Sequence, residues 1–469
     1  MAHRQSGPNS FRKERRLLRI FLLIIKLAIG LASLVAAALV RMPFTLAWRP
    51  WLLAAVVTVS AGLLAASLGW RRGTGQSLTG QGLSGQGWTR RADLAPFVLA
   101  AAAPLLALGC EGRFQFDRWT VNHADPAQIE ALGRHVIVGY TDPAFVRDLI
   151  ARRAIAGLFL TRRNVAGRDT AAVAREIAEL QAVRASQGLQ PLLVATDQEG
   201  GSVSRLSPLV PREPPLAQIV RDKEERGARE AAVTAYAREQ GRALAALGVN
   251  LNFAPVVDLD FGLRNPNDAY TRISRRAISS DPAIVAEVAT WYCDGLAAEG
   301  VRCTAKHFPG LGRVFEDTHR DEGRLDAPLD ELAQADWRPF RALLDHGVEV
   351  LMVGHVRSAA LDPAGPVSTS RAAIEGLLRK QWGYDGLIVT DDMTMGAIYF
   401  GNDGSPQAAI RALNAGVDLL LFSFDGEQVY PALAALLRAH DTLDSAMLAK
   451  STDRLRRLTA EPIKRAPLG

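Results

Sequence analysis

The segment KHFPGLGRVFEDTHRD, residues 306–321, gathers ionisable side chains around a Pro-Gly turn. Within it Asp317 lies two residues before His319, close enough along the chain for its carboxylate to hold one ring nitrogen and leave the other available. Because histidine has an ordinary pKa of about 6.5, such a ring can donate a proton in one step and accept one in the next. Asp317 and His319 are therefore predicted to form an acid/base dyad, on a loop that can move over a bound substrate.

Other polar side chains each follow a short apolar run that indicates a β-strand. These are Asp197, Asp258, Lys306 with His307, His355 and Asp391. Adjacent strand residues point to opposite faces, so only one of Asp391 and Asp392 can point inward. We predict that Asp391 does, on the expectation that Val389 faces the surrounding helices, and that Asp392 supports a helix amino terminus or the neighbouring carboxylate. The alternative is that both aspartates cap the next helix.

This mixture of donors and acceptors is suited to a polyhydroxylated ligand. The fixed donors are Lys306, Arg205 and Arg276, and Asp197 is an acceptor. Zinc binding by His307, His319 and His355 is the main alternative. However, Lys306 is a poor neighbour for a cation, and the sequence has no His-x-x-x-His pair of the kind that binds zinc. No metal is therefore predicted.

Eight short apolar runs bounded by Gly, Pro or Asp recur after residue 111. They cover residues 135–140, 157–160, 191–197, 251–258, 304–308, 348–356, 386–392 and 417–422. Their continuous apolarity indicates strands buried on both faces, and the stretches between them, such as 172–187 and 283–299, have helical period and length. The sequence thus predicts an α/β fold, a (β/α)8 TIM barrel with its active site at the carboxyl ends of the strands. The competitor is an open doubly wound sheet, but no strand is followed by a Gly-rich dinucleotide turn, so no cofactor is predicted.

Charge is divided unevenly along the 469 residues. Residues 1–92 contain thirteen Lys and Arg and a single acid, whereas the rest of the chain contains 42 Lys and Arg against 48 Asp and Glu. The positive excess flanks apolar segments, where Lys and Arg set membrane orientation, so a lipid bilayer is predicted as a partner and nucleic acid is not. Three cysteines, Cys110, Cys293 and Cys303, provide no disulfide framework and assign no redox compartment.

Three segments of the first 110 residues are candidate transmembrane helices. Residues 51–70 carry no charge and are bracketed by tryptophans, as in an aromatic belt. Residues 17–40 are long enough but include Arg19 and Lys26. Residues 94–110 are at the lower limit of length and could instead be re-entrant. A cleaved signal peptide would have one early apolar run rather than several, and the ALGC sequence before residue 111 has its leucine and alanine in the wrong order for lipidation.

Positive charge lies before the first segment and again between the second and third, at residues 4–16 and 71–91. If all three segments span, the protein is a multi-pass protein of the cytoplasmic (inner) membrane, and the remaining chain lies on the outer, periplasmic or extracellular side. If 94–110 does not cross, that chain stays inside. The predicted domains are a membrane region, 1–110, with a Gly/Gln-rich linker at 73–87, and a barrel domain, 111–469.

Residues 130–460 resemble glycoside hydrolase family 3, in particular its single-domain β-N-acetylhexosaminidases, which act on N-acetylglucosamine in cell-wall muropeptides. The matching pieces are ATDQEGGSVSRL (195–206), NFAPVVD (252–258), RAISSDP (276–282), KHFPGLG (306–312), EDTHRD (316–321), LMVGHV (351–356) and IVTDDMTMGAI (388–398). The resemblance implies that Asp391 is a nucleophile that forms a covalent glycosyl-enzyme with net retention, and that His319, oriented by Asp317, is the acid/base. It also implies that the first sugar is held by Asp197, Arg205, Arg276, Lys306 and His307.

The chain departs from the usual KHFPGHGD of this family at Leu311 and Arg313, and Thr318 replaces a frequent serine. The base of the loop and the aglycone site are therefore expected to differ. The expected function is an exo-acting β-N-acetylglucosaminidase of peptidoglycan turnover. The alternatives are a catalytically silent, membrane-tethered sugar-binding barrel, and a family 3 enzyme of other specificity or one that transfers the sugar to phosphate.

Overall fold

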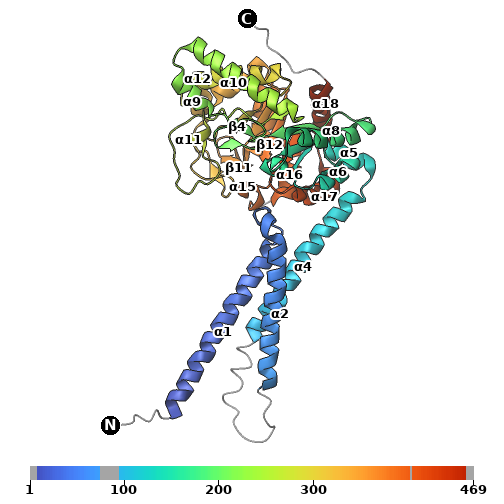
Figure 1. Ribbon diagram of the computed structural model, residues 1–469, viewed down its shortest axis with the longest axis vertical. Helices are drawn as coiled ribbons and strands as arrows, with labels where there is room; N and C mark the ends of the chain where they lie inside the picture. The colour runs from blue at the N-terminus through green and yellow to red at the C-terminus, as the bar shows by residue number, and fades with distance from the viewer. Residues whose placement is uncertain (1–7, 74–93, 402–403, 461–469) are drawn as a thin grey trace, which may run out of the picture. The chain divides into compact units, whose positions relative to one another are not determined.

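The computed structural model describes residues 8–73, 94–401 and 404–460. By its internal contacts the chain divides into two compact units, Met1–Asp117 and Arg118–Gly469. Figure 1 shows the first unit as long helices and the second as helices around a sheet. Most of the linker predicted at 73–87 lies outside the described residues.

The first unit contains three long apolar helices. They are α1 (Pro8–Leu39), α2 (Arg49–Gly73) and the first part of α4 (Leu94–Asn122), with a short 3-10 helix, η1 (Pro43–Trp48), between α1 and α2. The stretches Ile20–Leu39, Pro43–Ala66 and Leu94–Asn122 are long and apolar enough to cross a membrane. Pro104 lies inside α4 without ending it, so the segment predicted at 94–110 belongs to one continuous helix.

Helices α1 and α4 run in the same direction through this unit. A Cβ atom at Gly30 would lie 2.9 Å from the Cβ of Leu99, and just after α1 the Nε of Arg41 donates to Oε2 of Glu111 at 2.7 Å. The offset along the chain is 69 residues at the first contact and 70 at the second, as parallel helices require. Alanines fill the space between the two contacts, and such small side chains let membrane helices approach closely.

The second unit is built on a parallel sheet of eight strands in the order β6-β3-β2-β1-β13-β12-β9-β7. Its strands are β1 (Val136–Gly139), β2 (Gly157–Leu160), β3 (Leu193–Thr196), β6 (Leu251–Asn252), β7 (Ala305–Phe308), β9 (Val350–Val353), β12 (Leu387–Asp392) and β13 (Leu419–Phe422). Each lies inside one of the eight runs that the sequence predicts. The α/β class and the parallel strands are therefore confirmed.

The sheet is curled, so that its two edges meet as in TIM-barrel domains. A parallel bridge joins Val256 to Lys306, and the N–H of Val257 donates to the carbonyl oxygen of Lys306 at 2.8 Å. The strand predicted at 251–258 is shortened to two residues, β6. Pro255 lies in the missing part and has no N–H for a ladder hydrogen bond.

The inner face of the curled sheet carries the main hydrophobic core. Its strand members are Ile137, Phe159, Leu193, Ala195, Leu251, Val350, Met352, Leu387, Val389, Leu419 and Leu421. Val389 belongs to this inner core. The expectation that Val389 faces the helices, on which the choice of Asp391 over Asp392 was based, is therefore wrong.

Helices connect the strands and surround the sheet (Figure 1). They are α5 (Pro126–Gly133), α6 (Pro143–Ala151), α7 (Arg162–Val165), α8 (Thr170–Ser186), α9 (Leu216–Asp222), α10 (Arg226–Ala246), α11 (Ile273–Arg276), α12 (Pro282–Ala298), α13 (Leu329–Gln334), α14 (Trp337–His346), η3 (Ala372–Gln381), α15 (Gly396–Tyr399), α16 (Gly404–Ala415), α17 (Val429–Arg438) and α18 (Ser445–Ala460). Short strands extend the loops: β4 (Gln198–Gly200), β5 (Val203–Ser204), β8 (Gly323–Arg324), β10 (Val356–Ser358) and β11 (Asp362–Pro366). Asp169 and Asp281 begin α8 and α12 by accepting N–H groups of the first turn at 2.7 and 2.8 Å, as N-caps do.

Cys293 and Cys303 form a disulfide that was not predicted from the sequence; their Cα atoms are 5.3 Å apart. Cys293 lies on α12, and Cys303 comes shortly before β7. The bond therefore fastens the helix to the start of the strand that carries Lys306. Disulfides of this kind form and persist in oxidising compartments.

A buried carboxylate, Asp418, joins two outer elements to the sheet just before β13. Its Oδ2 accepts from Nη2 of Arg379 and from the N–H of Ile388, the latter at 2.7 Å. Its Oδ1 accepts from Nη1 of Arg454 at 3.3 Å. Arg379 lies in η3 and is itself buried. Without Asp418 the Arg379 cation would lose its main counter-charge inside the protein.

We expect Asp418→Ala to lower the free energy of unfolding by about 3–5 kcal/mol, because it leaves a buried cation uncompensated. Urea denaturation of the detergent-solubilised chain, followed by tryptophan fluorescence, measures the change. Asp345→Ala, at an exposed aspartate of α14, is the control and should lie within about 0.5 kcal/mol of wild type. A loss below about 1 kcal/mol for Asp418→Ala would contradict the importance of this ion network.

Candidate active site

The predicted polar residues come from the carboxyl ends of different strands. Lys306 and His307 lie in β7, Asp391 lies in β12, and Asp197 directly follows β3. Parallel strands have their carboxyl ends at the same edge of the sheet, where TIM-barrel enzymes build their sites. Ion pairs and hydrogen bonds join most of these residues into one network.

A buried carboxylate, Glu199, lies at the centre of this network and was not predicted from the sequence. Its Oε1 is 2.6 Å from Nζ of Lys306 and 2.6 Å from Nη2 of Arg276, and its Oε2 accepts from Nε of Arg276 at 2.9 Å. Lys306 also donates to Oδ1 of Asp197 at 2.7 Å. Burial alone would raise the pKa of Glu199, but the charges of Arg276 and Lys306 hold it well below its usual range. Glu199 therefore stays ionised and keeps both cations in place.

His307 is held by Asp258, which lies beyond β6. The Nδ1 of His307 is 2.7 Å from Oδ2 of Asp258, and Asp258 Oδ1 accepts from the N–H of Leu311 at 2.7 Å. The other ring nitrogen, Nε2, is 3.4 Å from Nη2 of Arg276. Because a guanidinium can only donate, the Nε2 of His307 accepts and its Nδ1 carries the proton. Leu311, a departure from the family pattern, thus contributes its backbone to this arrangement.

The two adjacent aspartates of β12 have different surroundings. Asp392 accepts hydrogen bonds from Thr394, Ser423 and Phe424 through backbone and hydroxyl groups. Within the described part of the chain, the carboxylate of Asp391 accepts only from the N–H of Asp392, at 2.8 Å. Burial would raise the pKa of Asp391, but the nearby histidines, His307 first among them, lower it. Asp391 is therefore an ionised carboxylate with free acceptor capacity at the end of the strand.

His355 holds the backbone beside this pair of aspartates. Its Nε2 lies 3.1 Å from the carbonyl oxygen of Asp392, and its Nδ1 lies 2.7 Å from the hydroxyl of Ser368. Since a carbonyl only accepts, Nε2 carries the proton. Burial lowers the pKa of His355, which keeps the ring neutral. His355 therefore fixes the backbone of the strand end.

The loop after β7 brings the predicted dyad together. The Nδ1 of His319 lies 3.2 Å from Oδ1 of Asp317, while Asp317 Oδ2 accepts the N–H groups of Ala269 and Tyr270 at 3.0 and 3.1 Å. Burial would raise the pKa of Asp317, but its hydrogen bonds with His319 and Thr271 hold it well below its usual range. No hydrogen bond from the described residues reaches Nε2 of His319, whose side chain is 32% exposed. That nitrogen is available to a substrate.

The remaining predicted residue, Arg205, is joined to the network only through its backbone. Its N–H donates to the carbonyl oxygen of Asp197 at 3.1 Å, while its side chain is exposed. Arg313, the second departure from the family pattern, anchors the base of the loop. Its Nε donates to Oδ2 of Asp336 at 2.9 Å, and its guanidinium lies 4.1 Å from the ring centroid of Phe261.

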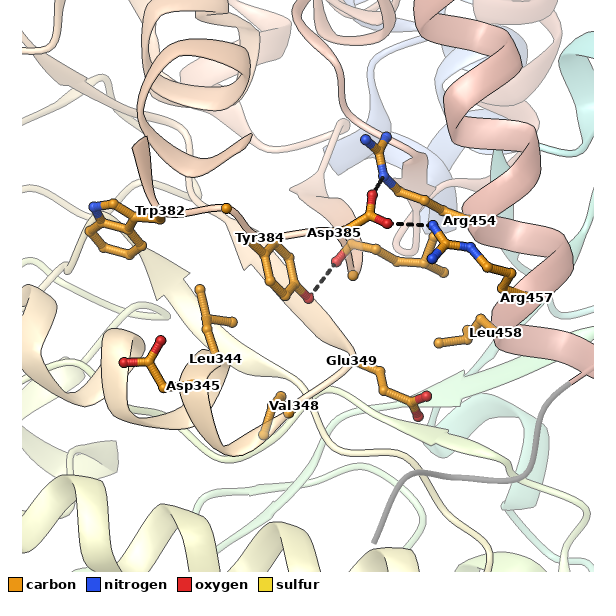
Figure 2. A pocket seen from close by; sticks show the side chains of 14 residues that line it. Leu344, Asp345, Val348, Glu349, Trp382, Tyr384, Asp385, Arg454, Arg457 and Leu458 are labelled. Atoms are coloured by element: carbon orange, nitrogen blue, oxygen red, sulfur yellow. Dashed lines mark hydrogen bonds and ion pairs between the residues drawn. The ribbon is translucent and has the colours of Figure 1, made fainter. Parts of the chain in front are cut away.

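Metal binding finds no support among the described residues, where no group of three or more His, Cys, Asp and Glu side chains could hold an ion. A cavity of about 340 Å³ lies elsewhere, lined by Asp345, Glu349, Tyr384 and Asp385 among others (Figure 2). Glu349 and Asp385 come just before β9 and β12, so this cavity is at the amino ends of the strands, opposite Asp391. Figure 2 shows Asp385 bound by Arg454 and Arg457, an arrangement that stabilises the fold.

Comparison with known protein families gives one match over most of the second unit. The model of the glycosyl hydrolase family 3 N-terminal domain matches residues 128–458.

Two curated relatives and one solved structure are similar to the chain. A beta-hexosaminidase of Xanthomonas euvesicatoria pv. vesicatoria is 38% identical over 280 residues, which are 59% of this chain and 78% of that protein. The beta-hexosaminidase LpqI of Mycobacterium tuberculosis is 34% identical over 339 residues, 69% of this chain and 82% of that protein. The structure of a glycoside hydrolase family 3 beta-N-acetylglucosaminidase from Paenibacillus sp. str. FPU-7 superposes with a TM-score of 0.64 and 33% identity, covering 71% of this chain and 63% of that one.

The contribution of Glu199 to the free energy of unfolding depends on pH, and this dependence can be measured. Because its pKa is lower in the folded than in the unfolded chain, its contribution to stability is present above an ordinary pKa of about 4.5 and is lost as the pH falls below it. We expect the free energy of unfolding of Glu199→Gln to fall less steeply than that of wild type between about pH 5 and pH 3. Urea denaturation at each pH measures both slopes, with Glu239→Gln, at an exposed glutamate of α10, as the control. Parallel curves for wild type and Glu199→Gln would contradict the assignment.

Proposed function

The chain belongs to glycosyl hydrolase family 3, as a β-N-acetylhexosaminidase, and we propose that it is a retaining, exo-acting enzyme. Its proposed substrate is terminal N-acetylglucosamine of cell-wall glycan or muropeptides, and its proposed intermediate is a covalent glycosyl-aspartate. The family match and the curated beta-hexosaminidase relatives support the reaction class. A closed TIM barrel of the family 3 type is the proposed scaffold.

The observation that carries the mechanism is the difference between Asp391 and Asp392. Asp392 is occupied by hydrogen bonds to the loops that follow β12 and β13. Asp391 is half-buried at the strand end, with an ionised carboxylate and histidines around it. A nucleophile needs lone pairs that no protein donor occupies, and of these two residues Asp391 has them.

In the first step, the proposed nucleophile Asp391 forms a bond to the anomeric carbon while the glycosidic C–O bond breaks. The Nε2 proton of His319 passes to the departing oxygen, and the electron pair of the broken bond stays with that oxygen. Asp317 remains anionic because its pKa is lowered, so it stabilises the imidazolium before the transfer. The products of this step are the free aglycone and a glycosyl-Asp391 ester.

In the second step, Nε2 of His319 takes a proton from a water molecule whose oxygen attacks the anomeric carbon. The ester bond to Asp391 breaks, and its electrons return to the carboxylate. Two displacements at the same carbon give net retention of configuration. The ring is then protonated for the next cycle.

The first sugar is proposed to contact Asp197, Arg276, Lys306 and His307, with Arg205 from the loop after β3. The ion pairs and the hydrogen bond that join these four residues and Glu199 support this role, because they hold donors and acceptors in fixed positions before a substrate arrives. Such preorganisation saves the entropy of ordering long side chains on binding. A sugar-binding barrel without turnover would use the same residues but would not need Asp391 or His319.

We expect Asp391→Ala to abolish release of 4-nitrophenol from its N-acetyl-β-D-glucosaminide, and His319→Ala to reduce it by about 10²- to 10⁴-fold, the usual contribution of a general acid/base. Proton NMR of the first product formed should show the β-anomer. Asp345→Ala and His440→Ala, both at exposed positions, are the matched controls and should keep wild-type rates. An active Asp391→Ala variant, or α-anomer as the first product, would refute the mechanism; product analysis with and without phosphate separates hydrolysis from transfer.

The proposed location is the cytoplasmic membrane, with three spans and the catalytic unit on the outer side. The parallel contacts of α1 and α4 support this topology, because two parallel helices that both span must end on the same side. The Lys and Arg of residues 4–16 and 71–91 favour the cytoplasm for the other ends of these helices. The Cys293–Cys303 disulfide supports an oxidising surrounding for the catalytic unit.

Reporter fusions test this topology directly. Alkaline phosphatase, which is active only outside the cytoplasm, should be active when fused after Ala124, and β-galactosidase, which is active only inside, should be active when fused after Arg72. Positive charge at the cytoplasmic ends is the physical reason. The reversed pattern at either site would exclude an outward catalytic unit.

A further inference from the structure

We infer that Thr271 is a positioning residue for the acid/base imidazole, because its hydroxyl holds both members of the dyad from an adjacent loop. The inference rests on the proposed role of His319. Thr271 lies in the loop between β6 and α11, is 3% exposed, and makes no hydrogen bond with the proposed nucleophile among the described residues.

The hydroxyl oxygen of Thr271 lies at the centre of the dyad. It is 2.9 Å from Oδ1 of Asp317, 3.1 Å from Nδ1 of His319, and 3.1 Å from the N–H of Thr318, which donates to it. The Oδ1 atom of Asp317 in turn also accepts the backbone N–H of His319 at 3.1 Å. One buried oxygen therefore contacts three successive residues of the catalytic loop.

These contacts determine which proton lies where. A threonine hydroxyl has one proton and two lone pairs. The ionised carboxylate of Asp317 has no proton to give, so the hydroxyl donates to it. The lone pairs of Thr271 then face the N–H of Thr318 and Nδ1 of His319. The two atoms near Nδ1 of His319, the hydroxyl oxygen of Thr271 and Oδ1 of Asp317, both act as acceptors. Nδ1 therefore keeps its proton, and all proton exchange occurs at Nε2.

Thr271 is itself held in place by the sugar-binding network. Its carbonyl oxygen accepts from Nη1 of Arg276 at 2.9 Å, and the same guanidinium binds Glu199 and lies against His307. The next residue, Arg272, has a φ of 40°, a left-handed conformation that non-glycine residues adopt only at a cost in free energy. Two interactions of Asp268 maintain this bend, through the N–H groups of Tyr270 and Arg272. The position of the Thr271 hydroxyl therefore depends on residues of the proposed sugar-binding site.

Loss of the hydroxyl should act on proton transfer rather than on the fold as a whole. Without it, Nδ1 keeps only the 3.2 Å contact with Asp317, and the ring loses the constraint that points Nε2 outward. Proton donation to the departing oxygen matters most when that oxygen is a poor leaving group. A 2,4-dinitrophenolate leaves with little help, whereas the alkoxide of a sugar requires the proton.

The test is a series of N-acetyl-β-D-glucosaminides, from 2,4-dinitrophenyl through 4-nitrophenyl and phenyl to methyl, assayed with the full-length chain in detergent. We expect Thr271→Val to lose at least about tenfold more kcat/KM on the methyl than on the dinitrophenyl substrate, as a defect in general acid catalysis requires. Thr271→Ser, which keeps the hydroxyl, should follow the wild-type dependence. Thr318→Val removes a buried hydroxyl that lies 3.3 Å from that of Thr271 but makes no hydrogen bond with Nδ1 among the described residues, and it should also keep that dependence.

Thr271→Ala is measured alongside, because it removes the hydroxyl without introducing a second methyl group and keeps the test available if Thr271→Val does not fold. Equal losses on all leaving groups, or no loss in either variant, would overturn the inference while leaving the proposed function intact. If His319→Ala itself showed no dependence on the leaving group, the proposed acid/base role would be wrong instead. The two failures are therefore distinguishable.

Discussion

One carboxylate buried between two cations, Glu199 between Lys306 and Arg276, is the interaction on which the site depends. Moving an ion out of water costs several kcal/mol unless an opposite charge replaces the lost hydration. The three groups come from β4, from β7 and from α11, so they can be buried only if these segments converge. That convergence brings Asp197 against Lys306 and the loop of Thr271 against Arg276. The proposed sugar-binding residues and the proposed acid/base dyad are thereby positioned by the same ion pairs.

Most of the strands were predictable because they are continuous apolar runs, the pattern expected of strands that are buried on both faces. Where prediction and structure differ, the reason is local: Pro255 cannot donate, so β6 is short. The choice between Asp391 and Asp392 rested on a false premise about Val389, which belongs to the inner core. What distinguishes the two carboxylates is how many donors reach each one, and no sequence pattern reports this.

Glu199 and Thr271 were missed because their roles depend on distant partners. Glu199 is 77 residues from Arg276, and Thr271 is 48 residues from His319. A single glutamate next to glycines, or a threonine in a polar loop, has no periodicity or spacing that indicates chemistry. The sequence shows both residues, but it does not show which distant residues they contact. The same holds for the disulfide, whose two cysteines gave no framework by count alone.

The Cys293–Cys303 bond has a consequence for how the enzyme matures. Cys303 is three residues before Lys306, so the crosslink anchors the strand from which the sugar-binding cation projects. With the proposed topology, thiol oxidation can occur only after translocation, when the segment meets the oxidants of the envelope. Newly made chains in the cytosol would therefore lack this disulfide. In that topology, export of the chain precedes the crosslink that fastens α12 to the start of β7.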